Sequence, residues 1–288
     1  MIRRPPRSTR KESSAASDVY KRQTLSSRSY IDYESPYHPV IGNSGMVVSQ
    51  NNLSSDIGLE ILNKGGNAID AAVAVGFSLA VTLPRAGNLG GGGFMLVYLK
   101  ESDEIFYIDY RSKSPLNSNL ENIFDIINNT GKPYVTVPKD FDYDLFDVLD
   151  EGYKASALPG TVAGLLDAHS RFGKLTLKEV LTPVIKQASE GIVVSYDLYK
   201  AIESTPRLLK DPESKRIYFK NNKPIKENSI LKLPDLAQTI SLIAENGKDG
   251  FYKGVTAKKI DQAMKNNNGL LSLEDFSEYK ACFLYTSD

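Results

Sequence analysis

The sequence predicts an α+β fold, with a layered αββα arrangement as its more specific form. The predicted strands cluster before residue 112, and the predicted helices dominate after residue 160. Their order is not the simple β-α alternation that a doubly wound sheet requires. Hydrophobic residues make up 41% and charged residues 24% of the 288 residues, so the chain is long and apolar enough for a sizeable core.

The first part of this fold is predicted to contain a short strand and two helices. The apolar run 45–49 is consistent with a buried strand. Apolar residues then recur at helical spacing over 53–62, and Gly65 ends that helix because glycine adopts the left-handed conformation at little cost. Asn67 is the predicted N-cap of a second helix that runs to about Val81. This helix is apolar nearly all round, so we expect it to be buried.

A glycine-rich stretch, 84–93, leads into two apolar segments, 93–99 and 104–110, which predict a β-hairpin. With the turn centred between positions 101 and 102, the numbers of cross-strand partners sum to 203. Gly92 is then expected opposite Arg111, at the open end of the hairpin.

The remainder of the chain predicts mainly helices. Residues from about 112 to 157 are polar and irregular, with one short helix near 120–127. Thr161 is the predicted N-cap of the next helix, and Gly173 ends it. Further helices are predicted from the capping box 176–179 to Gly191, over 235–246, over 256–266, and after a cap at 272–275.

The glycine-rich stretch does not match a nucleotide-binding loop. No register of it has the glycine spacing of a dinucleotide fingerprint, and Gly92 is followed by Gly93 and Phe94 where a Walker A loop has Lys and Ser or Thr. Bare backbone beside Arg111 would leave room for a small anionic ligand, since a guanidinium donates two parallel hydrogen bonds to a carboxylate. The alternatives are a tight structural turn and an exposed arginine at a strand end.

Composition excludes several other classes of site. Residues 1–30 carry eight Lys or Arg and two acidic residues, which leaves the rest of the chain mildly acidic and argues against a nucleic-acid surface. The single cysteine, Cys282, allows neither an internal disulfide nor a cysteine zinc cluster. No stretch is long and apolar enough to span a membrane, and no signal peptide is visible. We therefore predict no cofactor and no metal, and the residues themselves indicate no nucleophile.

The two ends differ from the rest of the sequence. We interpret residues 1–30 as a non-native or disordered segment and residues 282–288 as a non-native tail. The domain proper would then be residues 31–281.

Several motifs together resemble the large-subunit portion of the gamma-glutamyltranspeptidases, which are also called gamma-glutamyltransferases or glutathione hydrolases. The similarity covers about 45–280, and the motifs occur in the family order. They are Gly45-Met-Val-Val-Ser-Gln, the segment from Ile57 to Gly76, Gly87-Asn-Leu-Gly-Gly-Gly-Gly-Phe-Met95, Pro159-Gly-Thr-Val-Ala-Gly164 and Leu273-Glu-Asp-Phe-Ser-Glu-Tyr279.

This resemblance implies an N-terminal-nucleophile hydrolase with the layered αββα fold, incomplete in this chain. It implies a precursor that cleaves itself into two subunits, so that the new N-terminal threonine of the small subunit attacks gamma-glutamyl amides such as glutathione. That threonine is expected after the end of this chain, so no residue here is predicted to be catalytic. The family also implies a periplasmic or secreted location.

The same resemblance assigns a role to Arg111. The family motif Asp-x-Arg-Glu-x-x-Pro, whose arginine holds the substrate α-carboxylate, corresponds to Asp109-Tyr-Arg111-Ser112-Lys-Ser-Pro115. Ser112 replaces the usual acid, which would loosen the arginine or indicate another substrate. Two alternatives therefore stay open: a glutaryl or cephalosporin-type acylase of the same fold, and a non-catalytic fragment that binds small anions. We also expect the chain alone to be poorly soluble.

Overall fold

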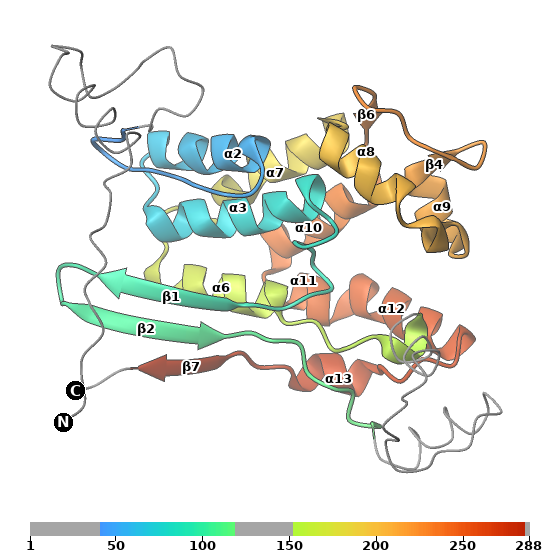
Figure 1. The fold of residues 1–288 in the computed structure, drawn as a ribbon. Coiled ribbons are helices and arrows are strands. Elements are labelled where there is room, and N and C mark those ends of the chain that lie inside the picture. The colour runs from blue at the N-terminus through green and yellow to red at the C-terminus, as the bar shows by residue number, and fades with distance from the viewer. Residues whose placement is uncertain (1–40, 119–151, 286–288) are drawn as a thin grey trace, which may run out of the picture. The chain divides into compact units, whose positions relative to one another are not determined.

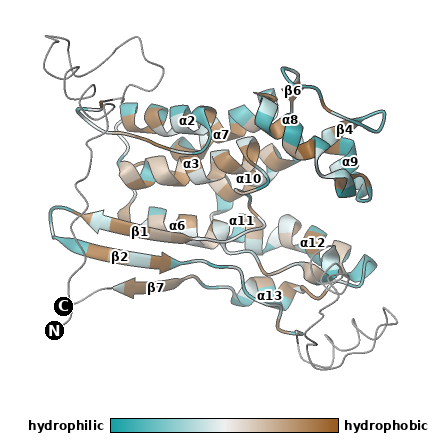
Figure 2. Cartoon of the chain, in the orientation of Figure 1, coloured by the Kyte–Doolittle hydropathy of each residue, from teal (hydrophilic) through white to brown (hydrophobic). Residues whose placement is uncertain are grey.

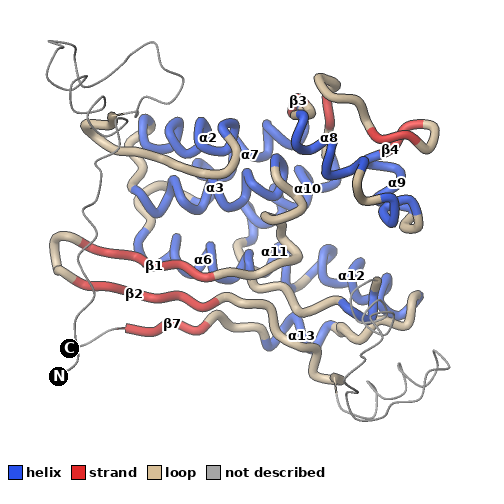
Figure 3. The backbone as a smooth tube through the Cα atoms, in the orientation of Figure 1, coloured by secondary structure: helices blue, strands red, loops and turns tan. Residues whose placement is uncertain are grey.

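The computed structural model describes residues 41–118 and 152–285, and all elements below lie in the compact unit that begins at Met46. Figure 3 shows helices in most of this unit and strands in a few short stretches. The strands are β1 (Phe94–Leu99), β2 (Glu104–Asp109), β3 (Ile192–Val193), β4 (Phe219–Lys220), β5 (Lys223–Pro224), β6 (Ile230–Leu231) and β7 (Cys282–Tyr285). The helices are α2 (Asn52–Asn63), α3 (Ala68–Thr82), α6 (Thr161–Phe172), α7 (Leu177–Glu190), α8 (Tyr196–Glu203), α9 (Pro212–Tyr218), α10 (Pro234–Asn246), α11 (Asp249–Tyr252), α12 (Gly254–Asn266) and α13 (Leu273–Glu278), with the 3₁₀ helices η2 (Tyr153–Ala155) and η3 (Pro206–Leu209).

The main sheet has three antiparallel strands in the order β1-β2-β7. Phe94 pairs with Asp109 and Leu99 with Glu104, which is the register that the centred turn predicts. Two small ribbons, β3-β6 and β4-β5, lie apart from this sheet. The α+β prediction and the hairpin are therefore confirmed.

Helices pack in layers against one face of the sheet (Figure 1). The ring centroids of Phe106 on β2 and Phe172 on α6 are 4.9 Å apart, so α6 is the helix next to the sheet. Helix α6 contacts α3, which contacts α2 and α7, and α7 contacts α10. The predicted burial of the helix after Asn67 is confirmed, because α3 contributes Val73, Phe77 and Val81 to the fully buried core.

A buried carboxylate joins the start of α3 to the loop after α6. Asn67 and Asp70 form a capping box, in which the Asn67 backbone N–H donates to Asp70 Oδ2 at 2.9 Å. The same carboxylate accepts from the Lys174 N–H at 3.0 Å and from the Leu175 N–H at 3.2 Å. Asp70 has no exposed surface, and these backbone donors compensate the cost of burying it.

A second buried polar cluster links three helices. Ser54 Oγ on α2 lies 2.8 Å from Ser78 Oγ and 2.8 Å from Thr82 Oγ1 on α3. Ser78 Oγ in turn donates to Gln187 Oε1 on α7 at 2.7 Å. Because each hydroxyl has a partner, these polar groups fix how α2, α3 and α7 sit together rather than weakening the core.

Two local predictions are wrong. Residues 45–49 form no strand, and Val48 is 81% exposed, because no strand of the described residues lies alongside this run. Thr161 is the first residue of α6, and its N-cap is Gly160. The caps and ends predicted at Gly65, Asn67 and Gly191 are confirmed.

Three further segments are either not described by the structure, not predicted from the sequence, or not decided by it. The short helix expected near 120–127 lies outside the described residues. No element was predicted between residues 192 and 231, where α8, α9 and the two ribbons occur. Residues 282–285, interpreted as part of a non-native tail, form β7 and pair with β2, and that interpretation stays a prediction. No helix within the described ranges has the length and apolarity to cross a membrane.

The sheet face that points away from α6 is apolar and exposed. Leu96, Tyr107 and Leu284 form one row across the three strands, and Phe94 and Tyr98 flank Leu96 on β1. Leu96 is 70% exposed, Tyr98 57%, Phe94 56% and Leu284 52%. Figure 2 shows hydrophobic colouring along these strands. We call these five residues the open sheet face, and a patch of this kind is typical of a surface that another layer covers.

We predict that this chain produced alone is poorly soluble because of the open sheet face. Leu96→Glu should increase the soluble fraction by placing a charge at its centre. The matched control is Leu59→Glu on α2, because Leu59 is also exposed but lies outside the open sheet face. This substitution should not increase the soluble fraction. The soluble fraction after centrifugation and the size-exclusion profile are compared for both variants and the unmodified chain. A monodisperse unmodified chain with a sharp thermal transition would contradict the prediction.

Candidate functional site

The glycine loop and the end of β2 lie side by side. Beyond the last ladder pair, the Tyr110 N–H donates to the Gly93 carbonyl at 3.0 Å, and the Gly93 N–H donates to the Tyr110 carbonyl at 3.3 Å. Gly92 is therefore opposite Arg111, as the hairpin register predicts.

Gly92 approaches the neighbouring backbone too closely for any side chain. A Cβ atom at this position would lie 2.5 Å from the Ser112 nitrogen, 2.6 Å from the Tyr110 carbonyl oxygen and 2.9 Å from the Arg111 carbonyl carbon. These atoms are backbone and cannot rotate away. Glycine is required here by contact, because the loop packs directly on residues 110–112.

The N-terminus of α6 holds the other side of the loop. The Gly160 N–H donates to the Gly91 carbonyl at 2.7 Å, and the Thr161 N–H donates to the same oxygen at 3.1 Å. The Tyr110 ring packs on α6 where Gly164 has no side chain. The spacing of Gly160 and Gly164, one helical turn apart, thus lets β2 and the glycine loop contact one helix.

Arg111 has a fixed backbone and an exposed side chain. Its N–H donates to Asp109 Oδ1 at 2.8 Å, and its carbonyl accepts from the Tyr279 hydroxyl at 3.0 Å. The residue is exposed, and its guanidinium forms no ion pair with any residue in the described ranges. A partner-free arginine beside side-chain-free backbone is suited to bind a carboxylate.

The segment after Arg111 is anchored at two further points. Lys113 and Leu158 exchange two backbone hydrogen bonds, at 2.7 and 3.1 Å. The Leu116 N–H donates to Asp275 Oδ1 at 2.6 Å, and Asp275 is fully buried at the start of α13. Residues 111–116 are therefore held by α13 and by the chain that enters α6.

Two stacked tyrosines lie behind this segment. The rings of Tyr252 and Tyr279 are parallel within 5°, with centroids 5.7 Å apart. Burial raises the pKa of Tyr279 to about 12, with the nearby Asp109 and Asp167 adding to the shift. Burial also raises the pKa of Tyr252. Both hydroxyls therefore stay protonated at neutral pH and remain hydrogen-bond donors.

Sequence reasoning placed Arg111 beside the glycine loop, and the structure confirms that placement. It did not assign a function to Tyr279, Tyr252 or Asp275, although Asp275 and Tyr279 lie in one of the motifs noted above. For Asp275 and Tyr279 the sequence signal was their position in that motif, and their contacts join residues more than 150 positions apart. Tyr252 lies outside the motif, and its contacts to Pro159 and Ala163 span about 90 positions.

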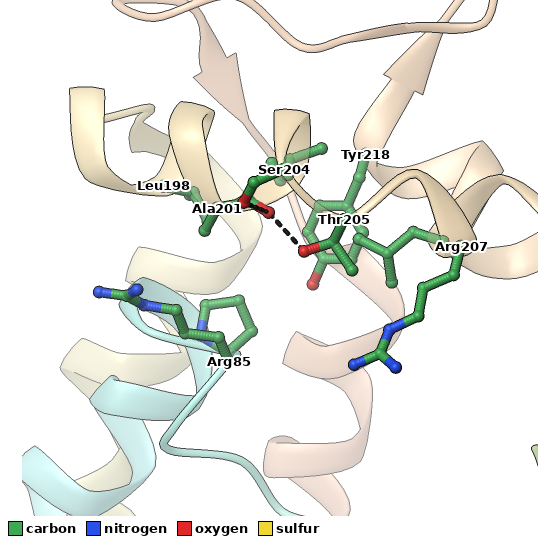
Figure 4. Close-up of a pocket in the computed structure, with 10 residues that line it drawn as sticks. Arg85, Leu198, Ala201, Ser204, Thr205, Arg207 and Tyr218 are labelled. Carbon is green, nitrogen blue, oxygen red and sulfur yellow. Dashed lines mark hydrogen bonds between the residues drawn. The ribbon is translucent and has the colours of Figure 1, made fainter. Parts of the chain in front are cut away.

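A separate cavity of about 420 Å³ lies between α8, η3 and the end of α3 (Figure 4). It includes none of residues 90–93 or 110–112. Arg85 at its edge is paired with Asp197 through two contacts of 2.7 and 3.0 Å. We assign no function to this cavity, which is lined by Pro84, Arg85, Leu198, Ala201, Ile202, Ser204, Thr205, Arg207, Leu208 and Tyr218.

Comparison with known proteins gives consistent matches. The family model for gamma-glutamyltranspeptidase matches residues 54–284. The glutathione hydrolase proenzyme of Escherichia coli (strain K12) is 40% identical over 255 residues, which cover 88% of this chain and 41% of that protein. The acylase ACY 1 proenzyme of Pseudomonas sp. (strain SE83) is 34% identical over 250 residues, covering 86% of this chain and 43% of that protein. The chain thus spans less than half the length of these relatives.

A solved structure gives the same result for the fold. The crystal structure of Helicobacter pylori gamma-glutamyltranspeptidase matches with a TM-score of 0.75 and 34% identity, over 85% of this chain and 67% of that one. This likeness shows the α+β fold of N-terminal-nucleophile hydrolases.

We predict that Gly92→Ala disrupts the site, because the added methyl group would overlap the backbone of residues 110–112. The melting temperature should fall by several degrees and ligand binding should be lost. Gly90→Ala is the matched control, since its Cβ would meet only Asn88 Oδ1, at 3.3 Å, and that side chain can move. Equal effects of the two substitutions in thermal unfolding would argue against the close packing.

Proposed function

The chain belongs to the gamma-glutamyltranspeptidase family, and we propose that its full-length protein is a gamma-glutamyltransferase and glutathione hydrolase. The protein would cleave the γ-amide of gamma-glutamyl compounds such as glutathione. The gamma-glutamyl group would pass to an N-terminal threonine that is not in this chain, and from there to water or to an acceptor amine. The names of the relatives, which include glutathione hydrolase proenzyme, support this proposal.

In this proposal Arg111 binds the α-carboxylate of the substrate. The observation that carries it is the position of the arginine: opposite Gly92, anchored through its backbone, with a guanidinium that no described residue pairs. The planar fork of arginine donates two parallel hydrogen bonds to a carboxylate. Such contacts hold the substrate in the site, and another part of the protein would supply the nucleophile.

The partner in this proposal is a small subunit that the proenzyme releases by cleaving itself. The open sheet face supports it, because an apolar sheet face of this kind is normally covered by a second layer. We further propose a periplasmic or secreted location, which is supported by family membership alone.

An acylase that acts on glutaryl amides is the second candidate. The 34% identity to an acylase proenzyme favours it, and so does Ser112, which replaces the acid of the family motif. Both substrate classes carry a carboxylate that Arg111 can bind, and only the gamma-glutamyl class carries an α-amine.

We predict that Arg111→Ala raises KM for a gamma-glutamyl anilide about 10- to 100-fold in the full-length protein, because a net loss of about 1.5–3 kcal/mol, the contribution of one charge-assisted hydrogen bond, corresponds to that factor. The KM of Arg111→Lys should lie between those of the unmodified protein and Arg111→Ala, since lysine keeps the charge but cannot form the bidentate contact. The control is Arg216→Ala on α9, an exposed arginine with surface ion pairs, which should leave KM unchanged. An unchanged KM for Arg111→Ala would remove Arg111 from the site.

A substrate panel separates the two candidate activities. We expect kcat/KM to be higher for gamma-glutamyl amides than for glutaryl amides with the same leaving group, because only the former present an α-amine for recognition. A preference for glutaryl amides would instead assign the protein to the acylases.

A further inference from the structure

The orientation of Arg111 depends on contacts to its backbone. No described side chain holds the guanidinium, and the Ser112 side chain makes no hydrogen bond to it. The direction in which the Arg111 side chain leaves the backbone is therefore set by how residues 110–112 are held. One of the contacts that hold them is a side-chain hydroxyl: Tyr279 Oη donates to the Arg111 carbonyl at 3.0 Å.

Tyr279 is itself held rigidly. It is 8% exposed, directly after α13, and its ring stacks in parallel on Tyr252. Lys113 Nζ lies 5.0 Å from the centroid of the Tyr279 ring and donates to the Lys280 carbonyl at 3.0 Å. The hydroxyl therefore has little freedom to follow a displaced Arg111, so it acts as a fixed reference point.

Tyr252 connects this reference point to the glycine loop. Its hydroxyl donates to the Pro159 carbonyl at 2.8 Å and accepts from the Ala163 N–H at 3.2 Å. The next residue after Pro159, Gly160, donates to the Gly91 carbonyl. The stacked pair of Tyr279 and Tyr252 thus connects the Arg111 backbone to residues 159–163, and the same stretch donates the hydrogen bonds that hold the glycine loop.

We propose that Tyr279 is a positioning residue for substrate binding, which sets the distance and direction of the Arg111 guanidinium relative to the glycine loop through the Arg111 carbonyl. This inference rests on the proposed function, because it concerns how Arg111 meets the substrate carboxylate. Preorganisation of this kind lowers the entropy lost when substrate binds, and it acts on affinity rather than on the chemical step.

Tyr279→Phe tests the inference in the full-length protein, since it removes the hydroxyl and keeps the ring that stacks on Tyr252. KM for a gamma-glutamyl anilide should rise about three- to tenfold, the effect of one lost hydrogen bond. The value of kcat should change less than about twofold, and the melting temperature should change by only a few degrees. The matched control is Tyr199→Phe on α8, whose hydroxyl bonds Glu203 at the surface and whose loss should leave KM unchanged.

A double-mutant comparison separates this inference from the proposed function. In the Arg111→Ala background, Tyr279→Phe should add no further rise in KM, because the residue through which it acts is absent. If Arg111→Ala raises KM and Tyr279→Phe does not, the positioning role alone is wrong. If Arg111→Ala leaves KM unchanged, the proposed function of Arg111 fails, and the positioning role fails with it. A fall in melting temperature or kcat with unchanged KM would show that Tyr279 is only structural.

Discussion

The contact between the Gly92 backbone and residues 110–112 is the constraint on which the site depends. The side-chain-free backbone that precedes β1 allows the residues after β2 to pack directly against it. The neighbouring pair of Gly93 and Tyr110 continues the hairpin ladder past its last regular pair. Helix α6 packs against both parts. Its N-terminal amides donate to the Gly91 carbonyl, and the Tyr110 ring packs on it where Gly164 has no side chain. This packing fixes the position of the Arg111 backbone.

The rest of the described structure keeps that arrangement rigid. The buried Asp70 carboxylate ties α3 to the chain after α6, and the serine and threonine hydroxyls between α2, α3 and α7 satisfy one another. Asp275 does the same for the segment after Arg111. In each place a buried polar group is satisfied by backbone or by another buried polar group, which makes one relative arrangement of the elements much more stable than others.

Local sequence signals predicted the elements that depend on local chemistry. The helix caps at Asn67, Thr176 and Ser272, and the hairpin register, follow from side chains and turn length within a few residues. The run at 45–49 failed because a strand requires a partner, and apolar content alone does not supply one. Tyr279 could not be connected to Arg111 from the sequence, since 168 positions separate them and only the fold brings them together.

The first turn of α6 has a consequence for how selective such a site can be. Helix N-termini often bind anions, but here the amides of Gly160 and Thr161 are saturated by the Gly91 oxygen and that of Ala163 by the Tyr252 hydroxyl. These three amides are therefore not available to a ligand, and under the proposed function the Arg111 guanidinium is the group that recognises the substrate carboxylate. Under the proposed function, esterifying the substrate carboxylate would weaken binding about as much as removing Arg111, and added salt would weaken it by screening the charge pair.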